Sequence, residues 1–328
     1  MVSFPCQLNK QCAFCGESAL VHSRACQKDR SYAVSPQSNS TTLVAGLIDV
    51  FADTALSGNP LAVVEEADGL SESQMRRIAG EFNQAETTFV MRSERADLKL
   101  RSFTAAGAEV VGAGHNALGA WLWLAETGKL GAIQTPRLFR QEIGEEVLPI
   151  ELRPVDGRIF GRMTQSALKL GPVLADVSPL AAALGLAHED ILSEPAPRVA
   201  DTGVAHLLVR LRDVAAVDRA EPAAKGLLKV LSLASAEGCY IYAFDNAAPG
   251  RAYARFFNPT VGLWEDAATG TAAGPLAAYL ASEGLMSGAI EIEQGTRMGR
   301  RSLLRISLAP NPEISGAGIV VMRGVLTL

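Results

Sequence analysis

Gly-His-Asn-Ala-Leu-Gly-Ala at residues 114–120 has a second version later in the chain, Gly-Thr-Ala-Ala-Gly-Pro-Leu at residues 270–276. A single offset, the 156 residues from Gly114 to Gly270, aligns both stretches and also aligns Gly128 with Gly284. Each version follows a strand-like run and opens a segment that reads as a helix. Solenoid repeats have periods of about 20–50 residues, so a repeat this long indicates two related lobes.

The two helix starts are candidate anion sites. Free N–H groups and the helix dipole make a helix N-terminus attractive to negative charge. If the lobes face each other through these ends, both ends hold one small acidic molecule from opposite sides. We therefore expect a small carboxylated ligand between the lobes.

Composition narrows the class of protein. The chain has 328 residues, of which 48% are hydrophobic and 20% charged. This length predicts two domains, and these fractions of hydrophobic and charged residues are typical of globular proteins. The net charge of −5, without a basic stripe, excludes an obvious nucleic-acid partner. Because no apolar run reaches the roughly 18 residues of a membrane span, we expect no membrane partner and a cytoplasmic protein.

Residues 1–42 differ from the rest and are interpreted as a flexible N-terminal extension. They are locally basic and rich in Ser, Gln, Asn and Cys. This composition fits an organelle transit peptide, which would change the expected compartment, or a disordered extension. Four cysteines could form a zinc site here, although free thiols fit a lone C-x-x-C motif better. They are Cys6, Cys12, Cys15 and Cys26.

The remaining chain reads as many strands interrupted by a few helices. Ser71 and Gln74 form a capping box that predicts a helix start, and the repeat predicts one long helix in each lobe. Further helices are predicted from Asp176 to Gly185 and from Ala220 to Ala236. This order favours an α+β fold over a doubly wound parallel sheet.

We place the N-terminal lobe at residues 43–168 and the C-terminal lobe at residues 169–328. The last strands are free to return to the N-terminal lobe. The one cysteine of this body, Cys239, lies in an alternating, strand-like run and is predicted to belong to the core. A single thiol excludes a disulfide framework and favours a reducing compartment.

Three polar residues are candidates for chemistry. Glu86 lies where a helix ends and a strand begins, so it points into a cleft or else occupies an exposed turn. His115 follows Gly114 at the first helix start, where a neutral imidazole donates to a substrate oxygen, shuttles a proton or serves only as a cap. Asp266 precedes the second helix start at a spacing that suits a catalytic acid and a capping residue equally.

Other classes of site have no signature in the sequence. The chain contains four histidines but no H-x-x-x-H pair, so we predict no metal site. The segment from Gly270 to Gly274 lacks both the lysine of a Walker loop and the G-x-G-x-x-G fingerprint. We therefore predict no nucleotide site in this segment.

Several motifs occur in an order that is specific to one family. They are Gly58–Val64, Phe82–Val90, Gly114-His115, Asp201–His206, Glu265–Leu276, Gln294-Gly295 and Met298–Arg300. From about Leu43 to Leu328 the chain resembles the PhzF-like (phenazine biosynthesis-like) family of the diaminopimelate epimerase superfamily. The resemblance implies two pseudo-symmetric lobes, each a curled β-sheet or barrel around a central helix. It also implies a site between the lobes and a cofactor-free isomerase that is usually a homodimer.

The resemblance also implies roles for individual residues. By position, Glu86 is similar to the proton-transferring carboxylate of the family, and His115 and Asp266 match its other catalytic polar residues. Substrate binding is implied for residues at the two helix starts and for one asparagine. These are Asn59, Gly114, His115, Asn116, Gly270 and Thr271.

Some positions depart from the family pattern. Thr271 stands where serine is common and keeps the hydroxyl group. Asn116, Ala267 and Trp264 replace residues that are usually proline or small, which suggests a differently shaped pocket. Related epimerases and racemases use two cysteines, one at each helix start, and this chain has His115 and Thr271 at those positions. A two-thiol inversion of an amino acid is therefore not expected.

Taken together, the residues predict an isomerase that moves a proton within a small carboxylated metabolite. Glu86 would remove the proton from carbon and return it to another position. A lyase or cyclase that uses the same cleft is one alternative, and a non-catalytic binding or scaffold protein is another. The trio of Glu86, His115 and Asp266 argues against a scaffold, which would have no use for it.

Overall fold

The computed structural model describes residues 41–244, 250–261 and 263–328. The predicted extension, apart from its last two residues, lies outside the described residues, and so do its four cysteines and any targeting signal. The first strand begins at Thr42, one residue before the predicted start of the fold. Within the described ranges, no helix is long and apolar enough to cross a membrane.

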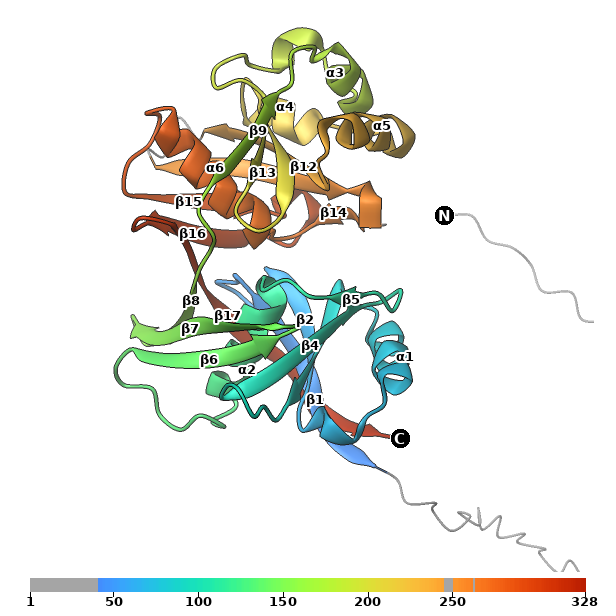
Figure 1. The fold of residues 1–328 in the computed structure, drawn as a ribbon, viewed down its shortest axis with the longest axis vertical. Helices are drawn as coiled ribbons and strands as arrows, with labels where there is room; N and C mark the ends of the chain where they lie inside the picture. The colour runs from blue at the N-terminus through green and yellow to red at the C-terminus, as the bar shows by residue number, and fades with distance from the viewer. Residues whose placement is uncertain (1–40, 245–249, 262) are drawn as a thin grey trace, which may run out of the picture. The chain divides into compact units, whose positions relative to one another are not determined.

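The first lobe contains eight strands and two α-helices among the described residues (Figure 1). The capping box at Ser71 and Gln74 is confirmed, because the Ser71 side chain accepts from the Gln74 N–H and the Gln74 side chain accepts from the Ser71 N–H. In chain order the elements are β1 (Thr42–Val50), β2 (Asn59–Val64), the short 3₁₀ turn η1 (Ala67–Gly69), α1 (Glu72–Phe82), β3 (Glu86–Met91), β4 (Leu98–Thr104), β5 (Glu109–Val110), α2 (His115–Glu126), β6 (Arg137–Ile143), β7 (Glu146–Val155) and β8 (Arg158–Thr164).

The second lobe repeats this plan with extra helices on its outer side (Figure 1). Its elements are β9 (Lys169–Val173), α3 (Ser178–Leu184), η2 (His188–Asp190), β10 (Arg198–Asp201), β11 (Ala205–Arg210), α4 (Val214–Arg219), α5 (Ala224–Ala234), β12 (Gly238–Phe244), β13 (Arg251–Asn258), η3 (Pro259–Val261), β14 (Leu263–Asp266), α6 (Gly270–Ser282), β15 (Ala289–Gln294), η4 (Thr296–Met298), β16 (Ser302–Leu308) and β17 (Pro312–Thr327).

The two lobes share one strand topology. In the first, β2 runs parallel to β3 and β4 runs parallel to β6, while β3–β4 and β6–β7 are antiparallel. In the second, β11–β12 and β13–β15 are the parallel pairs, while β12–β13 and β15–β16 are antiparallel. A helix crosses over between the strands of each parallel pair, as such connections require. The α+β prediction is therefore confirmed, and so is the duplication.

The helices α2 and α6 form the centres of the two lobes. The sheet curls around each of them, so that α2 contacts β1, β2, β3, β7, β8 and β17, and α6 contacts β10, β11, β15, β16 and β17. The first ten residues of α2, from His115 to Leu124, are all buried. A helix that is buried on all sides needs no polar face, which explains why neither repeat shows an amphipathic pattern.

The helix ends obey the same 156-residue offset as the sequence. Gly128 follows α2 and Gly284 follows α6, with φ angles of 79° and 70°. The N–H of each glycine donates to the carbonyl of the alanine three residues earlier, Ala125 in one lobe and Ala281 in the other. These left-handed positions favour glycine, so the repeated glycines fix where each central helix ends.

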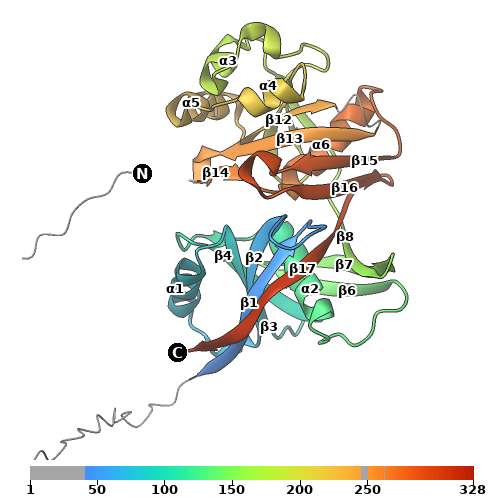
Figure 2. The same cartoon turned by 180° about the vertical axis from the view of Figure 1, so that it is seen from behind.

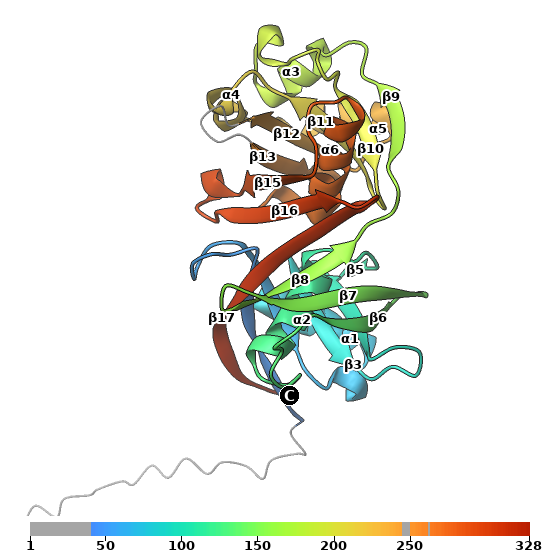
Figure 3. The same ribbon diagram turned by 90° about the vertical axis from the view of Figure 1, so that its left-hand side faces the viewer.

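The last strand ties the lobes together (Figures 2 and 3). At its start β17 pairs with β16, then with β8, and over its second half with β1. β17 is 16 residues long and begins at Pro312, still within the second lobe. Its first half could not be predicted from the sequence because Gly316 and Gly318 interrupt the apolar pattern. Both glycines lie close against first-lobe side chains, Phe51 and Ile48.

Two other details differ from prediction. The helix expected from Ala220 to Ala236 is α5, which covers only Ala224–Ala234, and the separate helix α4 lies before it. Asp213 caps α4 by accepting from the Ala216 N–H, and this short capped helix was missed. Cys239 is fully buried in β12, so its predicted core position is confirmed.

Gly119 tests how closely α2 must approach the sheet. A Cβ atom there would lie 2.6 Å from both Leu61 Cδ2 and Val50 Cγ2, which are fully buried. We predict that Gly119→Ala lowers the free energy of unfolding by about 1–3 kcal/mol through overpacking. Gly80→Ala is the matched control, since Gly80 is exposed in α1 and alanine should stabilise that helix by up to about 1 kcal/mol. Chemical denaturation measures both, and equal effects would refute close packing at Gly119.

Candidate active site

The Asp266 carboxylate lies where the two lobes meet. Asn59, the first residue of β2, donates through Nδ2 to Asp266 Oδ1 at 2.8 Å and to the Ala268 carbonyl at 3.0 Å. Thr269 Oγ1 donates to the other carboxylate oxygen, Oδ2, at 2.6 Å. Both oxygens of Asp266 are therefore held, one by each lobe. In Figure 1 the first turns of α2 and α6 lie at the ends of the lobes that face this junction.

Arg300 makes a second link between the lobes, and its partners in the first lobe lie close to Asn59 in the sequence. Arg300 follows η4 of the second lobe, and its guanidinium donates to the buried Asp49 carboxylate of β1 at 2.5 Å. The same group donates to the carbonyls of Ser57 and Gly58, in the loop that leads into Asn59. This clamp fixes the loop before Asn59, so the asparagine reaches Asp266 from a supported position.

Glu86 opens β3 and has an atom without a partner. The residue is partly exposed as a whole, but its Oε2 atom is shielded from solvent and accepts no hydrogen bond from the described residues. Burial raises the pKa of Glu86 to about 8, and the negative charge of Asp266 contributes in the same direction. The two carboxyl groups are therefore within electrostatic reach, and Glu86 favours its protonated form near neutral pH.

Asp266 has the opposite preference near pH 7. Burial raises its pKa to about 6, while the hydrogen bonds from Thr269 and Asn59 oppose the rise. Asp266 is therefore mainly ionised where Glu86 is mainly protonated. Environments that separate the pKa values of two neighbouring carboxyl groups are typical of acid–base sites.

His115 is the first residue of α2 and is 8% exposed. Burial lowers the pKa of His115 to about 4, so the imidazole is neutral at physiological pH. Its Nε2 atom is buried and has no hydrogen-bond partner within the described chain. A neutral ring with a buried nitrogen that lacks a partner in the described chain suits a group that donates to, or accepts from, a bound ligand.

Asn116 and Gly114 make their contacts within the protein. Asn116 Nδ2 donates to Ser102 Oγ and to the Gly112 carbonyl, and its Oδ1 accepts from the Gly114 N–H at 2.7 Å. This ring of bonds shapes the loop before α2, whose first-turn N–H groups have no partner within the helix. Asn59, Gly114 and Asn116 thus support the site internally. Substrate binding stays a prediction for the whole set of Asn59, Gly114, His115, Asn116, Gly270 and Thr271.

The start of α6 carries the remaining predicted residues. The Gly270 carbonyl accepts from Gln165 Nε2 at 2.8 Å, and Thr271 Oγ1 lies 3.1 Å from His206 Nε2. Neither Gln165 nor His206 was predicted as a site residue. His206 lies within the motif Asp201–His206, which the resemblance included without a role.

Gln294 is a further residue that sequence reasoning did not place at the site. Its Oε1 accepts from the Tyr240 hydroxyl at 2.9 Å and from the Thr269 N–H at 3.2 Å. Its Nε2 donates to the Asp266 carbonyl at 2.8 Å and to Thr269 Oγ1 at 3.0 Å. The buried amide therefore fixes the loop between β14 and α6. The only sequence signal was its place in the motif Gln294-Gly295.

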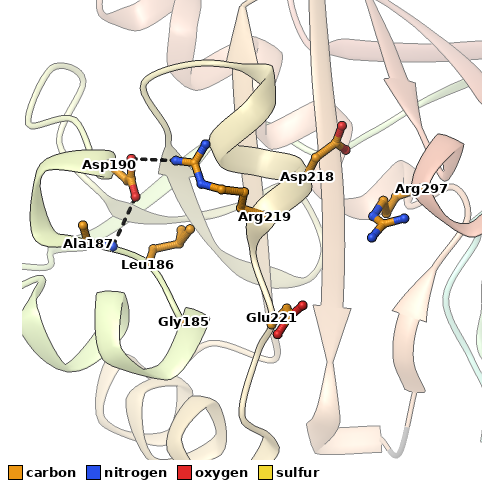
Figure 4. Close-up of a pocket in the computed structure, with 8 residues that line it drawn as sticks. All are labelled: Gly185, Leu186, Ala187, Asp190, Asp218, Arg219, Glu221 and Arg297. Carbon is orange, nitrogen blue, oxygen red and sulfur yellow. Dashed lines mark hydrogen bonds and ion pairs between the residues drawn. The ribbon is translucent and has the colours of Figure 1, made fainter.

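Among the described residues, neither a metal-binding cluster nor the cavity of the second lobe involves the candidate site residues. No group of three or more His, Cys, Asp or Glu side chains among residues 41–244, 250–261 and 263–328 could hold a metal ion. An open cavity of about 730 Å³ in the second lobe has a mixed-charge lining, and Figure 4 shows Asp190 there paired with Arg219 and with the Ala187 N–H. None of the candidate site residues lines this cavity.

The raised pKa of Glu86 has a measurable consequence for stability. Between pH 4.5 and about 8 the unfolded chain has lost this proton and the folded chain has kept it, so the free energy of unfolding falls as pH rises. We predict that Glu86→Gln removes this loss and is more stable than the wild type by on the order of a few kcal/mol at pH 8. The advantage should vanish near pH 4. Glu81→Gln, at an exposed site in α1, is the control, and denaturation at both pH values is the measurement. A variant that is less stable at pH 8 would contradict the assignment.

Similarity to known proteins covers nearly all of the described chain. The family described as Phenazine biosynthesis-like protein matches residues 48–324. The chain is 34% identical over 294 residues to trans-2,3-dihydro-3-hydroxyanthranilate isomerase of Pseudomonas chlororaphis, across 86% of this chain and 98% of the relative. It is 35% identical over 292 residues to the protein of the same name from Pseudomonas aeruginosa, across 85% and 97%.

Solved structures agree with this placement. A PhzF-family phenazine biosynthesis protein of Bacillus anthracis has a TM-score of 0.79 at 25% identity, across 88% of this chain and 100% of that one. A hydroxyproline epimerase of Agrobacterium vitis shares the fold alone, with a TM-score of 0.60 at 13% identity across 88% and 93%. The chain therefore belongs to the phenazine biosynthesis-like protein family and is, by class, an isomerase.

Proposed function

We propose that this isomerase moves a proton within a small carboxylated metabolite without a cofactor, and that Glu86 carries the proton. The observation that supports this most directly is the Oε2 atom of Glu86, which is shielded from solvent, has no hydrogen-bond partner in the described part of the chain and lies within electrostatic reach of the ionised Asp266. A buried carboxyl group without a partner costs stability, and such costs are retained where they serve chemistry. His115 Nε2 is likewise buried without a hydrogen-bond partner among residues 41–244, 250–261 and 263–328, and it is the second atom that we expect a ligand to contact.

The proposed reaction needs one base and a place for negative charge. The ionised form of Glu86 removes a proton from a substrate carbon, and the electron pair of that C–H bond spreads toward the substrate carboxylate. The first-turn N–H groups of α2 and α6 stabilise this charge as it develops. Glu86 then returns the proton to a different carbon, so that no atom is gained or lost. His115, neutral and close to the helix start, donates to or accepts from a substrate heteroatom.

Asp266 has a supporting part in this proposal. Its carboxylate is held from both sides by Asn59 and Thr269, so it is fixed and does not swing toward the substrate. Burial raises the pKa of Glu86 and the charge of Asp266 adds to the rise, which makes Glu86 a stronger base once ionised. An amino or other cationic group on the substrate would be attracted to Asp266.

The substrate class follows from the relatives. Their names identify trans-2,3-dihydro-3-hydroxyanthranilate as the compound they isomerise, and an anthranilate carries a carboxylate. We propose a substrate of that kind for this chain. The half-exposed Trp264, two residues before Asp266, is a bulky side chain that would distinguish its pocket. A homodimer located in the cytoplasm is part of the same proposal.

Glu86→Gln tests the proton carrier. We predict that kcat falls by ~10²–10⁴-fold, the usual contribution of a general acid–base group, because the nearly isosteric amide cannot accept the proton. Trans-2,3-dihydro-3-hydroxyanthranilate is the first substrate to assay. In heavy water the wild-type enzyme should place deuterium on one product carbon, unless the proton returns without exchange.

Binding separates loss of chemistry from loss of the pocket. Glu86→Gln should keep the wild-type affinity for 3-hydroxyanthranilate, an aromatic analogue with the same carboxylate, measured by calorimetry. An unchanged kcat in Glu86→Gln would overturn the role of this residue.

The pH dependence tests the ionisation state. Because Glu86 must be ionised to act as a base and its pKa is raised to about 8, kcat/KM should increase with pH up to about 8 and then level off. His115, with a pKa lowered to about 4, stays neutral over this range and adds no second limb. A rate profile between pH 5 and 10 is the measurement. A fall in kcat/KM between pH 7 and 9 would show that the protonated form of Glu86 starts the reaction.

A further inference from the structure

The Thr271 side chain has one hydrogen-bond partner among the described residues, and that partner is the side chain of a buried histidine. Thr271 is the second residue of α6, directly after Gly270, and its side chain is partly exposed. Its Oγ1 lies 3.1 Å from Nε2 of His206, which belongs to β11 and is 2% exposed. The hydroxyl group thus has one hydrogen bond to the protein, and the side chain that carries it is partly exposed to solvent.

The second ring nitrogen of His206 decides which group donates. Nδ1 is buried and has no hydrogen-bond partner in the described part of the chain. Burial lowers the pKa of His206 to about 4, so the ring is neutral and carries a single proton. If that proton were on Nδ1, a buried N–H would have no acceptor, which is among the rarest arrangements in proteins. With the proton on Nε2, the ring donates to Thr271 Oγ1, and only the lone pair of Nδ1 lacks a partner.

Packing holds the ring in this orientation. His206 meets the Phe256 ring edge-on with 4.9 Å between centroids, and Phe256 in turn meets Tyr240 at 6.0 Å. Gly238, which pairs with His206 across the parallel strands β11 and β12, leaves room for Phe256, since a Cβ atom there would lie 2.3 Å from that ring. The imidazole therefore has little freedom to turn Nε2 away from Thr271.

We propose that His206 is a positioning residue that makes Thr271 a hydrogen-bond donor to the substrate. When His206 Nε2–H occupies a lone pair of Thr271 Oγ1, the hydroxyl proton must point elsewhere. Thr271 is partly exposed and lies in the first turn of α6, next to Gly270, at the helix end where we expect a carboxylate. The inference rests on the proposed function, because it assigns the partner of the substrate carboxylate at this helix end.

The tautomer is tested in the free enzyme. Nitrogen-15 NMR of histidine-labelled protein, with His206→Gln to assign the signal, should show His206 protonated on Nε2 between pH 6 and 8. A proton on Nδ1 would overturn the proposal, because Thr271 would then donate to the ring and have no proton for a ligand. This measurement needs no substrate and no activity.

Binding of 3-hydroxyanthranilate tests the coupling between the two residues. Loss of a hydrogen bond to a charged group weakens binding on the order of tenfold to a hundredfold, and we expect this from Thr271→Val. His206→Phe should weaken binding nearly as much, and the double variant should be no weaker than Thr271→Val alone. Thr271→Ser, which keeps the hydroxyl, should bind as the wild type does. Independent, additive losses would refute action through Thr271.

Two amide variants separate positioning from packing. His206→Gln can present an amide N–H close to the place of Nε2, whereas His206→Asn can present one only close to the place of Nδ1. We expect Gln to restore much of the affinity that Phe loses, and Asn to restore none. Equal affinities for Gln and Asn would overturn the proposal. Failure of the proposed function shows separately, as an unchanged kcat in Glu86→Gln, whereas a wild-type protein that does not bind the probe would count against both.

Discussion

The buried carboxylate of Asp266 is the interaction on which the site depends. A carboxylate at 8% exposure is tolerated only when hydrogen bonds replace its water, and here the donors come from both lobes. Asn59 is 207 residues away from Asp266 in the chain, so this bond forms only when the lobes are correctly assembled. The same contact orients the loop before α6, and Gln294 also holds this loop by donating to the Asp266 carbonyl. Assembly of the lobes and assembly of the site are therefore one event.

The ionisation of Glu86 differs from that of the hydrogen-bonded Asp266. Asp266 is satisfied by hydrogen bonds and keeps its charge, whereas Glu86 Oε2 has no donor among the described residues and the carboxyl group loses its charge to burial. The two groups have the same chemistry, but their surroundings separate their pKa values. The separation costs stability at high pH, which is the kind of local cost that binding sites retain.

Features that depend on neighbours in sequence were predictable, and features that depend on distant contacts were not. The capping box at Ser71 and the two central helices follow from residues within a few positions of one another. His206 faces a partner 65 residues away, and its β-strand pattern marks it only as a core position. The substrate-binding prediction for Asn116 came from the family resemblance and could not foresee its bonds to Ser102 and Gly112, which depend on the loop conformation.

The duplication supplies the frame of the site, and the differences between the copies supply its chemistry. Each lobe aims the first turn of a central helix at the junction, and the same offset aligns His115 of α2 with Thr271 of α6. One copy therefore offers a neutral imidazole and the other a hydroxyl group. Val110 of β5 stands at the position of Asp266 in β14, so only the second lobe contributes a carboxylate there. Symmetric helix ends suit a substrate carboxylate and its spreading charge, whereas the single proposed proton carrier, Glu86, belongs to one lobe and its charged neighbour Asp266 to the other, so a duplicated frame holds an asymmetric site.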